Sequence, residues 1–402
     1  MWPLGPETIL HGGRAIETLG HSRKRGPSAV RSALGSLARA GPKGGAANFR
    51  IESPVKRVPP QTVAASRPVF LLTVSQALRR ETLSRKIHRV LSRAGLTALS
   101  RQLSRAMDLP PMRPHRRVKG SVWGVSLVKN EADIIVPAVE HLFRQGVEGV
   151  LVADNGSTDE TRALLGVLAE RYPIHLACDR EPGYYQGMKM DLLSDWARRA
   201  GADWIIPFDA DEFWFAPGET LSEYLRSCSA NIARGELHNL YPVPGIEFGQ
   251  GPWRLETTPQ HQVVKVAFRS CRYSFLGAGS NSVYRTGLSW NGLRVRRPGL
   301  SSSGLRVLHV PWRSYDQFRR KGRQGSEALS RTDYGANFGF HWRMLGSLGD
   351  EAAREKWDRI ISGQQVEGIC WSPGAPFRLV DPSTWSSWDP DGILTPEATI
   401  AP

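Results

Sequence analysis

The sequence predicts an α/β fold: a mostly parallel sheet with helices on both faces, preceded by a basic, partly disordered N-terminal arm. Three observations predict it. Apolar runs of strand length alternate with amphipathic stretches of helix length from Ser121 to Phe215, which is the pattern of consecutive strand–helix–strand units. Polar residues follow each apolar run. Positive charge is concentrated before residue 121.

The charge balance separates an arm from a body. The 402 residues include 53 Lys and Arg and 38 Asp and Glu, and a hydrophobic fraction of 40% is enough to form a core. Residues 1–120 hold 23 of the basic and 5 of the acidic residues, which leaves 30 basic and 33 acidic residues in the remainder. The net charge of +15 therefore belongs to the arm and says little about what the body binds.

The arm, residues 1–115, has two parts. Residues 1–68 are rich in Gly, Ala, Ser, Arg and Pro and show almost no apolar periodicity, so we expect disorder. Residues 70–107 place apolar residues at roughly helical spacing among arginines, which predicts one or two basic amphipathic helices. These helices could bind an anionic membrane surface or nucleic acid. The interpretation we favour is that they pack on the body with solvated arginines, and we do not expect nucleic acid as a partner.

The sequence gives no sign of a membrane span or a secretory signal. The longest apolar run in the arm, residues 69–74, is far shorter than the ~20 residues that a span needs. The first residues lack a basic stretch followed by an apolar one. The four cysteines are far apart, without metal-ligand or redox spacing. We therefore expect a cytoplasmic protein whose arm can contact the inner face of the membrane.

Four strands and three helices are predicted in the first half of the body. The strands are the apolar runs Val122–Val128, Val147–Ala153, Ile174–Cys178 and Trp204–Phe208. The first helix begins at its cap, Asn130, and ends before Gly146, with Pro137 near the first turns, where proline is better tolerated. The second begins at the capping box Ser157–Glu160, and the third spans residues 186–200.

Polar residues at the strand ends predict the site. In such sheets the ligand binds beyond the carboxyl ends of the strands. The four strands end in Lys129–Glu131, Asp154–Ser157, Asp179–Arg180 and Asp209–Glu212. The last group holds three carboxylates, which are costly to desolvate unless a cation such as a diphosphate-bound divalent metal neutralises them. Because positions i and i+2 of a strand face the same side, Asp209 and Asp211 could share one ion.

Three motifs occur in order along this half: Leu127–Glu131, Asp154–Asp159 and Asp209–Phe213. Together they resemble the family 2-like glycosyltransferases of the GT-A fold, in a subgroup that carries Lys-Asn-Glu, Asp-Asn-Gly-Ser-x-Asp and Asp-x-Asp-Glu-Phe. The combination is specific, although each motif alone is not. The resemblance covers residues 121–215 well and extends more loosely to about residue 329. We assign residues 120–345 to a GT-A glycosyltransferase domain and residues 346–402 to a C-terminal extension.

The resemblance implies transfer of a sugar from a nucleotide-sugar donor, a UDP- or GDP-sugar, with the help of Mn²⁺ or Mg²⁺. Asp209 and Asp211 would hold the metal, which as a Lewis acid stabilises the leaving nucleoside diphosphate. The donor would be bound by Lys129, Asn130, Glu131, Asp154, Asn155, Ser157, Gln186 and Lys189. For Lys189, a solvated helix residue is the alternative interpretation.

A second block, residues 305–318, also resembles the subgroup, whose members tend to carry His before Arg-Ser-x-x-Gln-Phe. By this resemblance His309 would complete the metal shell beside the two carboxylates. Arg313 and Lys321 would cover the diphosphate. Relatives often have a histidine near the position of Asn281, so that role would be moved here, for example to His309, or reduced.

Inverting transfer needs a base that takes the proton of the acceptor hydroxyl. Our candidate is Glu247, which follows the predicted strand Glu236–Tyr241, with Asp211 and Glu212 as rivals. A solvated loop carboxylate is the alternative interpretation of Glu247. One or two tryptophans could stack on sugar rings while the others belong to the core. The candidates are Trp214, Trp253, Trp290 and Trp312.

The function that these observations favour is a metal-dependent, inverting glycosyltransferase that moves a sugar to a glycan or envelope acceptor. Two other classes stay open: a polyanion- or membrane-surface-binding protein that uses the arm, and a nucleotidyltransferase with a related sheet. The second class usually has a Gly-rich, basic phosphate loop after the first strand, which residues 128–131 are not. An inactive transferase also stays open, although the presence of both Asp209 and Asp211 argues against it.

Overall fold

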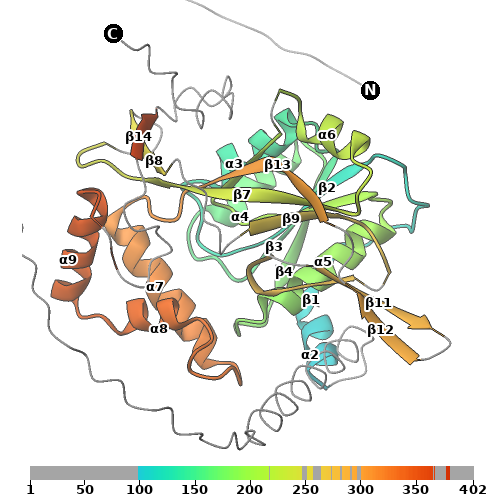
Figure 1. Cartoon of the computed structure of the whole chain (residues 1–402). Coiled ribbons are helices and arrows are strands. Elements are labelled where there is room, and N and C mark those ends of the chain that lie inside the picture. The colour runs from blue at the N-terminus through green and yellow to red at the C-terminus, as the bar shows by residue number, and fades with distance from the viewer. Residues whose placement is uncertain are drawn as a thin grey trace, which may run out of the picture. The chain divides into compact units, whose positions relative to one another are not determined.

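The computed structural model describes residues 98–216, 218–246, 251–256, 264–272, 274–280, 283–289, 292–296, 300–364, 366 and 377–380. Within them, eleven strands form one large sheet, shown in Figure 1. Neighbour by neighbour, its main path runs through β1 (Met107–Asp108), β4 (Ile174–Asp179), β3 (Gly149–Asp154), β2 (Val122–Val128), β5 (Trp204–Pro207), β9 (Val264–Arg269), β7 (Ile232–Tyr241), β13 (Leu300–His309) and β6 (Glu212–Phe215). Off this path, β8 (Trp253–Glu256) pairs with β7, and β14 (Phe377–Val380) pairs with β8.

The first half of the sheet is parallel and carries helices on both faces, which confirms the predicted fold class. β4, β3, β2 and β5 run parallel to one another. On β3, Val150 and Val152 belong to the hydrophobic cluster that includes α3 (Ile135–Arg144) and α4 (Thr161–Ala169). The alternate residues Leu151 and Ala153 belong to the cluster of α5 (Gln186–Arg199) on the other face.

The second half of the sheet is mixed. β9 runs antiparallel to both β5 and β7, whereas β13 runs parallel to β7 and antiparallel to β6. β7 begins at Ile232 and is longer than the predicted strand. This arrangement puts His309, the last residue of β13, opposite Asn239 of β7 and Glu212 of β6. A separate sheet consists of β10 (Ser274–Leu276), β11 (Val283–Ser289) and β12 (Gly292–Arg296).

The described end of the arm is part of the body. α2 (Ala98–Ala106) buries Leu103 and exposes Arg101 and Arg105. β1 follows directly and pairs with β4, where Met107 lies opposite Asp179. Residues 98–108 therefore add a helix and an edge strand to the fold. The other residues of the predicted amphipathic stretch, 70–97, lie outside the described residues.

Three helices follow β13: α7 (Tyr315–Ser330), α8 (Phe340–Ser347) and α9 (Asp350–Ile361), drawn in orange and red in Figure 1. They share a hydrophobic cluster in which Phe318, Leu345 and Trp357 are buried. α9 belongs to the predicted C-terminal extension, yet it packs on the domain through this cluster. The smaller elements α6 (Leu221–Ser227) and η1 (Ala278–Ser280) complete the described set. None of the described helices is both long and apolar enough to cross a membrane.

Two predicted helix caps are wrong. α3 begins five residues after Asn130, which instead adopts a φ of 55°. α4 begins at Thr161 and not at the predicted capping box, because Ser157 Oγ accepts a hydrogen bond from the backbone N–H of Asn130. Both polar side chains join two strand-end loops and are therefore not available to the helices.

Candidate active site

The loops that follow β2 and β3 are joined by reciprocal hydrogen bonds. Asn130 Oδ1 accepts the backbone N–H of Thr158 at 2.7 Å, and the N–H of Asn130 donates to Ser157 Oγ at 2.9 Å. The N–H of Glu131 donates to Thr161 Oγ1 at 2.8 Å. Asn tolerates the positive φ of position 130 better than most residues. The sequence prediction that these two motifs lie together therefore has a structural basis.

The β3 and β4 ends form a second polar set around Asp179. Asp179 Oδ2 accepts Asn155 Nδ2 at 2.7 Å and pairs with Lys189 Nζ at 2.6 Å. The side chain of Lys189 is 2% exposed. It is therefore not a solvated helix residue, and it is not open to a donor phosphate, which were the two interpretations from the sequence. Burial lowers the pKa of Lys189, and the charge of Asp179 opposes that effect. Asp154 is also buried, and its Oδ1 accepts the N–H of Ser157 at 3.1 Å.

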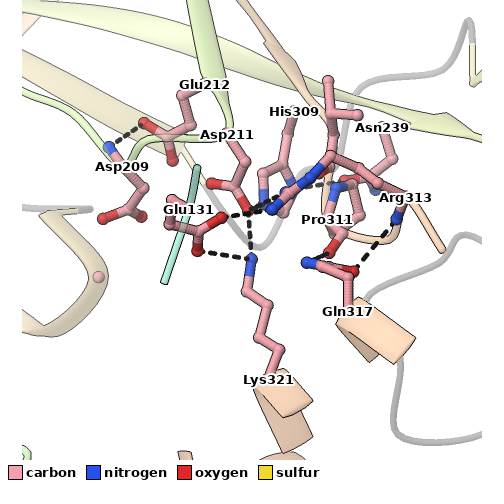
Figure 2. A network of polar contacts seen from close by, with 12 residues as sticks. Glu131, Asp209, Asp211, Glu212, Asn239, His309, Pro311, Arg313, Gln317 and Lys321 are labelled. Carbon is pink, nitrogen blue, oxygen red and sulfur yellow. Dashed lines mark hydrogen bonds and ion pairs between the residues drawn. The ribbon is translucent and has the colours of Figure 1, made fainter. Parts of the chain in front are cut away.

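Asp209 and Asp211 lie in the turn between β5 and β6, not in a strand. β5 ends at Pro207, and the N–H of Glu212 donates to the carbonyl of Asp209 at 3.0 Å. In a turn, residues i and i+2 need not face the same side, and the two carboxylates point in different directions in Figure 2. The inference that they share one ion because they share a strand face is therefore wrong in its premise.

Asp209, whose side chain is 30% exposed, pairs with the buried Lys265 of β9. Lys265 Nζ lies 2.8 Å from Asp209 Oδ2, 2.5 Å from Glu212 Oε1 and 2.9 Å from the carbonyl oxygen of Gly279. Gln186 Nε2 donates to the other carboxylate oxygen of Asp209 at 3.1 Å. Burial raises the pKa of Glu212 to about 8, against the opposing effect of Lys265. Near neutral pH, Lys265 is therefore mainly the counter-ion of Asp209.

Asp211 belongs to a different set, at the end of β13 and the first turns of α7. Its Oδ2 forms an ion pair with Lys321 Nζ and lies 3.6 Å from His309 Nε2 (Figure 2). Burial would raise the pKa of the Asp211 carboxyl, but the charge of Lys321 beside it holds that pKa well below its usual value. Asp211 is therefore ionised at any pH at which the protein would work.

Arg313 is buried and donates four hydrogen bonds from its five N–H groups. Its Nε donates to Asp133 Oδ2 at 2.6 Å, its Nη1 donates to the carbonyl of Val310 at 3.1 Å, and its Nη2 donates to both Asp133 and Glu131. The guanidinium thus ties the β2 loop to the segment before α7. This engagement leaves little of the fork for a diphosphate, which was its predicted partner.

A cavity of about 170 Å³ lies between the strand-end loops and α7. One wall comes from Lys129, Asn130 and Asn155, and the opposite wall comes from α7 with Arg320 and Lys321. Tyr184 and Gln186, at the start of α5, close one side, and Trp342 of α8 also lines the space. Predicted donor-binding residues from four separate segments therefore line a single cavity.

The residues present fit a divalent metal only in part. Within the described residues, no three His, Cys, Asp or Glu side chains gather in a way that would hold a metal ion. Asp211 and His309 supply one oxygen and one nitrogen donor 3.6 Å apart, and hard divalent ions in nucleotide sites take further ligands from phosphates and water. Asp209, turned to Lys265, does not join them in this arrangement.

The other residues considered from the sequence fall into two groups: three lie outside the described residues, and three are buried tryptophans. Glu247, Asn281 and Trp290 lie outside the described residues. Trp214 and Trp253 are fully buried and Trp312 is 4% exposed, so these three belong to the core.

Four residues of the site were not predicted from the sequence: Asn239, Glu256, Lys265 and Arg320. Lys265 gave one usable signal, because it stands between Val264 and Val266 in an apolar strand, where a lysine needs a buried partner.

Comparisons with known proteins give one family match. Residues 125–226 match the family model of Glycosyl transferase family 2, a segment that runs from β2 into α6 and contains both Asp209 and Asp211. The matched segment covers about a quarter of the chain. No curated protein matches the chain significantly.

Solved structures resemble the chain at low identity. S. aureus TarS is 13% identical with a TM-score of 0.32, and the match covers 59% of this chain and 48% of that one. S. aureus TarS 1–349 in complex with UDP-GlcNAc is 12% identical with a TM-score of 0.32, covering 60% and 81%. Glucosyl-3-phosphoglycerate synthase from Mycobacterium tuberculosis, with Mn²⁺, UDP and glucosyl-3-phosphoglycerate, is 17% identical with a TM-score of 0.22, covering 33% and 52%. The chain thus spans about half the length of the first of these proteins.

Proposed function

We propose that this protein is a metal-dependent, inverting glycosyltransferase that moves a sugar from a UDP- or GDP-sugar to a glycan or envelope acceptor. The observation that carries the proposal is the Asp211–His309–Lys321 cluster at the carboxyl ends of the sheet strands, in which Asp211 belongs to the segment that matches the family 2 model. A crevice at this edge is where α/β sheets of this kind bind nucleotides.

The donor would bind in the cavity beneath α7. Lys129 and the joined loops of Asn130 and Asp154 would hold the nucleoside, and Lys321 and Arg320 would face its diphosphate. Asp211 and His309 would hold Mn²⁺ or Mg²⁺, which when bound neutralises charge on the leaving diphosphate. Lys321, now paired with Asp211, could turn toward the phosphates when a metal takes over Asp211.

The acceptor side of the proposal depends on the base. Glu212 is fully buried with Lys265, so it does not face an acceptor, and Asp211 is already engaged by Lys321 and His309. Glu247 therefore stays the candidate that would take the proton of the acceptor hydroxyl. A cytoplasmic location, with the basic residues before α2 on an anionic membrane surface, belongs to the same proposal.

Thermal unfolding in the presence of nucleotides tests the proposal. UDP and GDP would each be added with and without Mn²⁺, and uridine and guanosine serve as controls that lack the diphosphate. We expect one nucleoside diphosphate to raise Tm only when Mn²⁺ is present, because a ligand that binds the folded state alone stabilises it. Absence of any shift with every nucleoside diphosphate would contradict the proposed donor site.

A further inference from the structure

A buried hydrogen-bond chain leads from β8 to the candidate metal residues. Asn239 Nδ2 donates to Glu256 Oε2 at 2.9 Å, and Asn239 Oδ1 lies 2.8 Å from His309 Nδ1. His309 Nε2 in turn lies 3.6 Å from Asp211 Oδ2. Asn239 and Glu256 are buried, at 1% and 0% exposure. None of the sequence motifs contains either residue.

The strand register builds this chain. Leu240 lies opposite Leu255, and Asn239 and Glu256 are the next positions of the same antiparallel register between β7 and β8. On its other side β7 pairs with β13, where Asn239 lies opposite His309. Three adjacent strands therefore set the spacing, and the side chains stand on rigid elements instead of loops.

The chemistry of the three groups fixes the direction of each hydrogen bond. The amide N–H₂ of Asn239 donates to Glu256 Oε2. The amide oxygen then faces His309 and also only accepts, so His309 Nδ1 must carry a proton and donate it. In neutral imidazole the other nitrogen is then unprotonated. Nε2 lies 3.6 Å from Asp211 Oδ2, so a proton or a metal ion can bridge these two atoms.

We propose that Glu256 and Asn239 are positioning residues that hold His309 as its Nδ1–H tautomer. His309 Nε2 and Asp211 Oδ2 would then be the two protein ligands of the divalent cation that binds with the donor. This inference rests on the proposed function. Metal-ligating histidines commonly donate their second N–H to an oxygen that fixes their tautomer and orientation. Here a buried carboxylate acts one step further out, by fixing which end of an amide faces the histidine.

The variant Glu256→Gln tests the inference with little change in shape. A glutamine amide can donate as well as accept, so Asn239 is free to turn its N–H₂ toward His309, which favours the Nε2–H tautomer and removes the lone pair. Asn239→Leu removes both hydrogen bonds at similar volume. Glu236→Gln is the matched control. Glu236 lies on β7, the strand of Asn239, and its side chain forms a partly exposed ion pair with Arg306 at 3.1 Å.

The first readout is the ¹⁵N chemical shifts of the imidazole, measured without metal at a pH where His309 is neutral and assigned by comparison with His309→Gln. We expect wild type and Glu236→Gln to show protonated Nδ1, and Glu256→Gln to show a mixture of tautomers. A neutral His309 that carries its proton on Nε2 in the wild type would overturn the inference.

The second readout is Mn²⁺ binding in the presence of UDP, followed by electron paramagnetic resonance. Loss of such an outer partner weakens metal binding about 10- to 100-fold, and we expect this for Glu256→Gln and Asn239→Leu but not for the control. Unchanged Mn²⁺ affinity in both variants would overturn the inference. If His309→Gln bound Mn²⁺ as tightly as the wild type, the metal assignment of the proposed function would be contradicted instead. The tautomer measurement would still decide whether Glu256 acts on His309.

Discussion

Asp209 and Asp211 are two residues apart in sequence, but their carboxylates are paired with different lysines. Asp209 Oδ2 lies 2.8 Å from Lys265 Nζ in the interior, whereas Asp211 is paired with Lys321 of α7 at the wall of the cavity. The two lysines differ in exposure, since the side chain of Lys265 is 5% exposed and that of Lys321 is 21% exposed, whereas the carboxylates differ the other way, at 30% for Asp209 and 4% for Asp211. We interpret the Lys265 pair as part of the scaffold and the Lys321 pair as the one that can exchange its cation.

Replacing Lys321 by Met should destabilise the protein in a way that a metal reverses. The substitution leaves the buried Asp211 without its main counter-ion, and breaking a buried pair costs on the order of 3–5 kcal/mol, less here because Lys321 is partly exposed. Chemical denaturation with and without Mn²⁺ measures the effect. We expect Mn²⁺ to restore part of the lost free energy of unfolding in Lys321→Met. An equal loss with and without Mn²⁺ would contradict the exchange of cations at Asp211.

The pKa of Glu212 predicts a pH dependence of stability. Because burial raises this pKa from 4.5 to about 8 in the folded protein, the folded state binds more protons than the unfolded state between these values. Stability therefore falls as pH rises from about 4.5 to about 8. In Glu212→Gln, which cannot ionise, the fall across this window should be smaller. Denaturation curves at intervals of pH provide the test, and identical slopes for the two proteins would show that Glu212 does not contribute.

Replacing Arg313 by Met separates a scaffold role from a phosphate-binding role. The variant leaves the charges of Glu131 and Asp133 without their shared donor, so we expect the free energy of unfolding to fall by about 3–5 kcal/mol. The more conservative Arg313→Lys should recover only part of this loss, since lysine lacks the planar fork. If stability were unchanged while the affinity for UDP fell, Arg313 would be a diphosphate ligand, as the sequence had suggested.

Truncation before α2 tests the part played by the basic arm. A protein that begins at Ala98 keeps α2 and β1, which pack on the body, and loses residues 1–97 with most of the excess positive charge. We expect it to bind UDP with Mn²⁺ as the full chain does and to lose binding to vesicles that contain anionic lipid. Vesicles of neutral lipid are the control. Retained binding to anionic vesicles would contradict membrane contact through the arm.

The sequence predicted those parts of the fold that depend on local patterns. The strand Val122–Val128 was predicted with its observed bounds because an apolar run between polar residues is a local signal, and the alternation of strands and helices gave the parallel half. Asn130 and Ser157 were assigned to helix caps because capping is the commonest local use of these residues. Their actual partners lie 27 or more residues away along the chain, which no local pattern reveals.

The location of the candidate site was predicted better than the ion pairs and hydrogen bonds within it. The strand-end rule placed Lys129, Asn155 and Asp211 together, and in the structure Lys129 and Asn155 line a cavity whose wall also holds Lys321, the partner of Asp211. It could not predict the partner of Asp209, because that partner is Lys265, a residue of an antiparallel strand 56 positions later. Ion pairs of this kind are set by tertiary packing, which periodicity does not encode.

The binding of UDP to wild type and to Asp211→Asn, measured by calorimetry with and without Mn²⁺, tests the central claim most directly. We expect Mn²⁺ to strengthen UDP binding to the wild type at least tenfold and to have no effect on Asp211→Asn, with both proteins folded by circular dichroism. UDP binding to Asp211→Asn that Mn²⁺ strengthens as much as in the wild type would contradict the account.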